Sequence, residues 1–138
     1  MIFDKRKHRQ RLLLVTIILF FSTQVAESLR INNLIELKKD SSSITIEWSV
    51  SPTNSLTLED TSATNPWIGF KIKYFTEKLQ YTPILLKNVL FRKFRLDNLK
   101  PNTEYKIQVS AYDSVGNEGP ASMLLTVKTY ETGLSLFT

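Results

Sequence analysis

The sequence contains no cysteine, only four glycines and a single histidine, His8, near its amino terminus. Without cysteine the chain has no disulfide bond, thiolate metal ligand or thiol nucleophile. His8 falls in a segment that we expect to be removed, so the mature chain also lacks the acid–base, nucleophilic and zinc-binding arrangements that use histidine. Neither a glycine-rich phosphate loop nor an Asn-x-Ser/Thr sequon is present. We therefore expect a protein that is not an enzyme and holds no metal or cofactor.

Beyond the amino-terminal segment, neither basic nor acidic residues are in large excess. The whole chain has a net charge of +5, and residues 1–28 contain five basic but only two acidic side chains. The remaining 13 basic and 11 acidic residues leave a net charge of only +2. Most of the basic excess therefore belongs to a targeting signal at the amino terminus, and we expect no nucleic-acid partner.

Long apolar runs are missing except for one near the amino terminus. Basic residues within 5–11 precede a nearly uninterrupted apolar run over 12–21, and small residues follow at Ala26 and Ser28. This order is typical of a secretory signal peptide that is cleaved after Ser28 or after Ala26. An uncleaved membrane anchor is the alternative, but the run has half of the roughly 20 residues needed to cross a bilayer. Residues 1–28 thus predict a secreted, extracellular protein without a stable membrane span.

Apolar and polar residues alternate with period two along the rest of the chain. In one segment, for example, Ile44, Ile46, Trp48 and Val50 are separated by polar residues. Such alternation is typical of antiparallel strands with one buried and one solvent-facing side. Several strands of this kind, separated by turn-rich segments, predict an all-β fold in which two sheets pack as a sandwich. We expect seven strands, at residues 31–37, 43–50, 68–75, 82–87, 90–96, 104–113 and 122–129.

These strands predict a single domain over residues 29–131, followed by a free tail over 132–138. A mature chain of roughly 110 residues is large enough to be held by packing without disulfide bonds. The connection over 51–67 is long, polar and rich in serine and threonine. Loops of this length are functional or locally disordered.

The segment 99–105, Leu-Lys-Pro-Asn-Thr-Glu-Tyr, resembles the tyrosine-corner pattern Leu-x-Pro-x-Thr-x-Tyr of fibronectin type III domains. Trp48 at the end of an Ile-x-Ile-x-Trp strand resembles the core tryptophan of that family, and Tyr74 resembles the tyrosine that ends its third strand. The resemblance spans about residues 30–130. It implies a seven-stranded, immunoglobulin-like antiparallel β-sandwich in which the corner tyrosine hydroxyl bonds to the backbone. The structural core residues that it implies are Trp48, Tyr74, Leu99, Pro101 and Tyr105.

Two functional signatures of the resembling family are missing. The loop over 114–120 contains no Arg-Gly-Asp, and the only tryptophans, Trp48 and Trp67, do not form a Trp-Ser-x-Trp-Ser box. The resemblance therefore implies an extracellular protein-binding or adhesion module whose protein partner is not specified. The alternatives are a structural spacer, a fragment or short isoform of a larger adhesion receptor, or a weak glycosaminoglycan binder.

Aromatic residues outside the expected core are the first candidates for a binding surface. Trp67 precedes the third strand, Phe91 has the outward parity of its strand, and Tyr112 has the opposite parity to Tyr105. Exposed aromatic side chains are typical anchors of protein interfaces. For Trp67, which follows Pro66, the alternative is that the ring closes one end of the sandwich.

Basic residues on two strands are the second candidates. Alternation places Lys71 and Lys73 on the solvent side of one strand, and Lys93 and Arg95 on the solvent side of another. Together they could form a polyanion contact, such as one for a glycosaminoglycan. We favour the alternative that they keep exposed strands soluble. The topology of the resembling family would also separate the two pairs into different sheets.

Overall fold

The computed structural model describes residues 29–51 and 66–133, and these form strands and turns without a helix. The expected signal peptide at 1–28 lies outside the described residues, as do most of the connection 51–67 and the tail beyond 133. Seven strands are present, as predicted from the sequence. They are β1 (Arg30–Lys39), β2 (Ile44–Ser51), β3 (Trp67–Phe75), β4 (Ile84–Leu86), β5 (Lys93–Leu96), β6 (Glu104–Asp113) and β7 (Leu125–Lys128).

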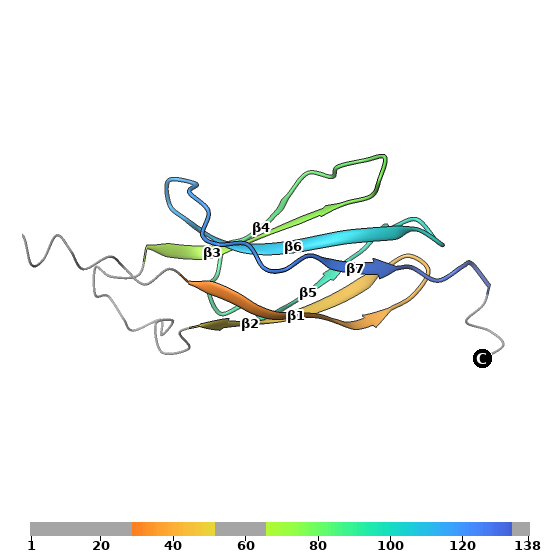
Figure 1. Cartoon of the computed structure of the whole chain (residues 1–138), viewed down its shortest axis with the longest axis horizontal. Helices are drawn as coiled ribbons and strands as arrows, with labels where there is room; N and C mark the ends of the chain where they lie inside the picture. The colour runs from red at the N-terminus through yellow and green to blue at the C-terminus, as the bar shows by residue number, and fades with distance from the viewer. Residues whose placement is uncertain (1–28, 52–65, 134–138) are drawn as a thin grey trace, which may run out of the picture.

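The strands form two antiparallel sheets that face each other, which Figure 1 shows as two layers. One sheet has the order β1–β2–β5 and the other the order β4–β3–β6–β7. The predicted all-β sandwich is therefore confirmed. Its core lies between the layers, because the inward-facing positions of β2, β3 and β6 are almost completely buried.

Three strands, β4, β5 and β7, are shorter than the sequence pattern predicts, and the first two have a clear local cause. β4 begins at Ile84, immediately after Pro83, which has no N–H to donate to a ladder. β5 begins only at Lys93 because residues 88–91 form a turn. In that turn the Asn88 side-chain oxygen accepts a hydrogen bond from the Leu90 N–H at 2.8 Å. Short edge strands of this kind discourage unwanted pairing with other chains.

The core is built around two large aromatic side chains. Trp48 on β2 packs edge-on against Phe70 on β3, with ring centroids 5.4 Å apart, and thereby joins the two sheets. Tyr105 on β6 is fully buried and Leu99 nearly so. Tyr74 is half-buried and stacks on Tyr81, with ring centroids 4.7 Å apart.

The segment 99–105 turns the chain from one sheet to the other. The Tyr105 hydroxyl accepts a hydrogen bond from the Lys100 N–H at 2.8 Å, and Asn102 adopts a positive φ of 49° that suits a tight turn. Burial raises the pKa of Tyr105 to about 12, although the Lys100 N–H opposes the shift. Pro101 is exposed, so its expected place in the core is wrong: it serves the turn at the surface.

A close approach between β3 and β4 depends on Gly69. A Cβ at this position would collide with the carbonyl oxygen of Leu86 and would lie 3.0 Å from the ring carbon Cε1 of Tyr112. Just before it, the register of β3 with β6 shifts between Trp67 and Gly69. The shift reverses the side to which the intervening Ile68 points, and Ile68 is 43% exposed.

Candidate binding surfaces

The basic residues expected to form one surface lie on different sheets. Lys71 and Lys73 are on β3, where both ammonium groups contact Glu118, at 2.9 and 2.7 Å. The hydrogen bond from Lys73 is the largest cause of the lowered pKa of the Glu118 carboxyl. Lys93 and Arg95 are on β5, in the opposite sheet.

The guanidinium group of Arg95 also contacts acidic residues. Its Nε lies 2.6 Å from Asp97 Oδ1, and its terminal nitrogen lies 3.7 Å from Asp40 Oδ2. The structure thus offers two small basic pairs, and three of their four members already contact a carboxylate. This arrangement does not form a continuous track for a polyanion.

The three aromatic candidates have different environments. Phe91 is 42% exposed in the turn before β5. Trp67 is half-buried and packs against the core. Its ring also lies against Gly119, where a Cβ would be 3.0 Å away. The indole therefore helps to close the end of the sandwich at which β3 begins. Tyr112 is buried, and the prediction that it is exposed is wrong. Its partner in the β3–β6 ladder is Gly69, which has no side chain, so the Tyr112 ring packs across β3 at this position.

Apolar residues from three segments meet on the outer side of the β4–β3–β6–β7 sheet. Ile68 on β3 is 43% exposed, Leu85 on β4 is 50% exposed, and Val115 in the β6–β7 loop is 84% exposed. Figure 1 shows this loop beside the start of β3 and the end of β4. The three side chains border a hollow of about 350 Å³, here called the outer-face groove. The groove is lined by Ile68, Lys71, Leu85, Lys87, Tyr112, Asp113, Ser114, Val115 and Gly116.

The loop that carries Val115 is held in shape by Asp113. The Asp113 carboxylate accepts hydrogen bonds from the N–H groups of Val115 and Asn117, at 3.0 and 2.8 Å, and from the Asn117 side chain at 2.9 Å. The backbone N–H of Asp113 donates to the Asn117 carbonyl, and its carbonyl accepts from Gly116. The hydrogen bond from the Asn117 side chain is the largest cause of the lowered pKa of Asp113. Gly116, with φ of 96°, supplies the left-handed turn.

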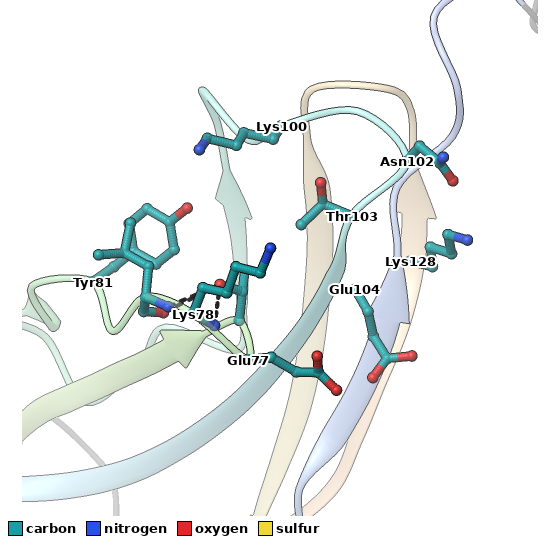
Figure 2. Close-up of a pocket in the computed structure, with 10 residues that line it drawn as sticks. Glu77, Lys78, Tyr81, Lys100, Asn102, Thr103, Glu104 and Lys128 are labelled. Atoms are coloured by element: carbon teal, nitrogen blue, oxygen red, sulfur yellow. Dashed lines mark hydrogen bonds between the residues drawn. The ribbon is translucent and has the colours of Figure 1, made fainter.

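A second hollow, of about 470 Å³, lies at the opposite end of the sandwich. Figure 2 shows that its side chains come from the β3–β4 turn, from the 99–105 segment and from β7. Lys78, Lys100 and Lys128 line it together with Glu77 and Glu104. Because its charges are of both signs and its lining is mostly polar, it lacks the apolar centre that a protein interface uses.

No metal-binding group of side chains is found in the part of the chain that the structure describes. Across residues 29–51 and 66–133, no three His, Cys, Asp or Glu side chains are grouped so that they could hold a metal ion. The same residues contain no helix long and apolar enough to cross a membrane.

Of the residues that line the groove, the sequence singled out only Lys71 and Tyr112, and it did not single out the exposed apolar residues. Strict alternation from Phe70 places Ile68 on the core side, and only the register shift turns it outward. Leu85 does have outward parity between Ile84 and Leu86, which was a usable signal. Val115 sits in a loop, where alternation predicts nothing.

Comparisons with known proteins agree with this architecture. The family model described as "Fibronectin type III domain" matches residues 30–128. A solved structure described as a myokine is 26% identical, with a TM-score of 0.56, and the match covers 73% of this chain and 96% of that one.

Two further solved structures are described as domains of CNTN1 or contactin 1. The chicken CNTN1 FN1–FN3 domains are 26% identical with a TM-score of 0.57, and the match covers 73% of this chain and 30% of that one. The fn3 domain of human contactin 1 is 21% identical with a TM-score of 0.55, over 77% and 83% of the two chains. A search of curated proteins found no match. The strand order, the tyrosine corner and the match over residues 30–128 show that this chain belongs to the fibronectin type III family.

Proposed function

We propose that the chain is exported and works outside the cell as a non-catalytic protein-binding or adhesion module. Fibronectin type III domains are common in adhesion and receptor proteins, and the family is generally non-catalytic. The observation that carries the proposal is the outer-face groove, where exposed apolar side chains from β3, β4 and the β6–β7 loop converge.

Exposed apolar residues scattered singly over a surface need no explanation, whereas exposed apolar residues that gather in one place with polar residues around them are typical of an interaction site. Ile68, Leu85 and Val115 form such a group, with Lys71 and Lys87 beside them. An apolar centre with a polar border is the usual composition of a protein–protein interface. Burial of these side chains by a partner would remove apolar surface from water, which is the main source of binding free energy.

The extracellular location rests on residues 1–28 and on the family. A basic stretch, an apolar run and small residues stand in the order of a secretory signal peptide. Fibronectin type III domains occur in extracellular and receptor proteins. A domain without cysteine folds equally well in an oxidising exterior, because it has no thiol to oxidise.

Export and binding are tested together with the full chain expressed in cultured animal cells. We expect mature protein in the medium, with an amino terminus at Leu29 or Glu27 on sequencing. We also expect the tagged mature protein to bind saturably to intact cells, and trypsin treatment of those cells to abolish the binding. A product that stays with the cells and keeps Met1 contradicts export.

The same binding experiment separates the alternatives. Binding that survives trypsin but is lost after heparinase identifies a glycosaminoglycan as the partner, which contradicts a protein-binding role. Secreted protein that binds to no cell type is the outcome expected of a passive spacer, and it also contradicts the proposal.

A further inference from the structure

We propose that the outer-face groove binds a segment of a partner protein in which an apolar side chain stands next to a carboxylate. This proposal rests on the protein-binding function proposed above and specifies both the surface and the chemistry of the partner. It draws on three independent features of the groove: its apolar centre, the charge on its border, and the rigidity of the loop that closes it.

The apolar centre is wide enough to receive one large side chain. The groove is an open hollow of about 350 Å³, with Ile68 and Leu85 on adjacent strands and Val115 on the loop. The buried ring of Tyr112, which lies against Gly69, also lines the groove. An apolar side chain placed here would contact apolar atoms from three segments, as the anchor residues of interfaces do.

The border of the groove carries positive charge that the protein itself does not neutralise. Lys87 forms no ion pair with any residue in the described ranges. Lys71, also in the lining, shares the carboxylate of Glu118 with Lys73. Asp113 is the only acidic lining residue among those described, and its carboxylate is already occupied by three N–H donors of its own loop. A carboxylate beside the apolar anchor therefore complements this border.

The loop beside the groove is ordered by its own hydrogen bonds. Five hydrogen bonds to the backbone and carboxylate of Asp113 fix the turn that presents Val115. A loop that is ordered before binding does not lose that conformational entropy when a partner arrives. This arrangement favours a preformed recognition surface over one that folds on its partner.

Two other occupants fit the groove less well. A polyanion gains little from the apolar centre, and one of the two lysines in the lining, Lys71, already contacts Glu118. Two copies that meet groove to groove would have to present an unpaired carboxylate beside the groove, and the acidic residues there, Asp113 and Glu118, are both engaged. Both occupants are outcomes of the test below.

The test uses the secreted mature protein and a random peptide library displayed on phage as the probe. We expect the selected peptides to pair a large apolar residue with Asp or Glu. Synthetic copies of them should bind at least about tenfold more weakly to Val115→Asp and to Lys87→Glu, because truncation or reversal of an interface anchor has effects of this size. The matched controls are Met123→Asp, in which the replaced side chain is 90% exposed but lies outside the groove lining, and Lys38→Glu on β1. The controls should bind like the wild type.

Every other result contradicts the proposal. In the selection, these results are that no peptide is enriched or that the enriched peptides lack acidic residues. In the binding assays, they are that groove and control variants bind equally or that heparin alone displaces the peptides. The last such result is that the mature protein dimerises and Val115→Asp abolishes the dimer. Thermal unfolding of each variant shows that a loss of binding is not a loss of folding. The cell-binding assay keeps the two proposals apart, because saturable, trypsin-sensitive binding that persists in the groove variants refutes the groove and leaves the protein-binding function intact.

Discussion

At the scale of single residues, the hydroxyl of Tyr105 holds the corner between β5 and β6. It accepts a hydrogen bond from the Lys100 N–H in a buried setting. We predict that Tyr105→Phe lowers the free energy of unfolding by about 1–2 kcal/mol, because the N–H loses its partner. Urea unfolding measures the difference, and Tyr130→Phe, in which the replaced tyrosine is 47% exposed, is the control. Equal stability of Tyr105→Phe and the wild type would show that the corner bond contributes nothing.

The same residue predicts a response to alkaline pH. The pKa of Tyr105 in the folded protein is about 12, above the ordinary value of 10.0, because burial disfavours the phenolate. A raised pKa of this kind gives a contribution to stability that is full below pH 10.0 and is lost as the pH rises towards 12. Tyr105→Phe removes the titrating group, so the variant should lose less stability than the wild type over this interval. Chemical unfolding at each pH measures the stability of both proteins. If the wild type and Tyr105→Phe lose the same stability over this interval, Tyr105 is not the titrating group.

Asp40 predicts a response at acidic pH. Hydrogen bonds from the Ser43 hydroxyl and the Ser42 N–H lower the pKa of its carboxyl from 3.8 to about 2. A lowered pKa gives a contribution that is present above pH 3.8 and is lost as the pH falls through 2. We therefore predict that Asp40→Asn is less stable than the wild type at neutral pH and that the difference shrinks below pH 3.8. A difference that does not change with pH would refute the role of the charge.

At the scale of elements, the attachment of β4 to β3 depends on the absence of a side chain at Gly69. A Cβ there would collide with the Leu86 carbonyl oxygen. We predict that Gly69→Ala costs about 1–3 kcal/mol, as overpacking does, and accelerates amide hydrogen exchange in β4. The control is Gly116→Ala, where a Cβ would meet no atom within 4 Å and only the positive φ is unfavourable. If Gly69→Ala leaves exchange in β4 unchanged, the close approach is not required.

The elements also show how far the sequence predicts this structure. Alternation located all seven strands and the sandwich, because each strand in the core has one buried side. Alternation failed at two irregular places in the β3–β6 ladder. The register shift before Gly69 turns Ile68 outward, and the absence of a side chain at Gly69 lets the Tyr112 ring pack against the strand and become buried. The groove is made of these irregularities together with a loop, so strict alternation could not have located it.

At the scale of the whole molecule, the distribution of charge predicts weak binding to polyanions. The net charge is only +2 beyond residue 28, and the candidate basic pairs lie on opposite sheets. We predict that the mature protein elutes from heparin below physiological ionic strength, about 0.15 M, because released counterions make such binding depend strongly on salt. Reversal of Lys93 and Arg95 to Glu should have little effect on elution. Retention well above this salt concentration that collapses in the reversal variant would move the function to matrix attachment.

The most direct measurement of the central claim is the binding of the mature protein to intact cells with and without its groove. Wild type, the double variant Lys87→Glu with Val115→Asp, and the control Lys38→Glu with Met123→Asp are compared by flow cytometry over a range of concentrations. The account predicts saturable, trypsin-sensitive binding by the wild type and the control, and at least about tenfold weaker binding by the groove variant. Equal binding by all three proteins, or no binding by the wild type, would contradict it.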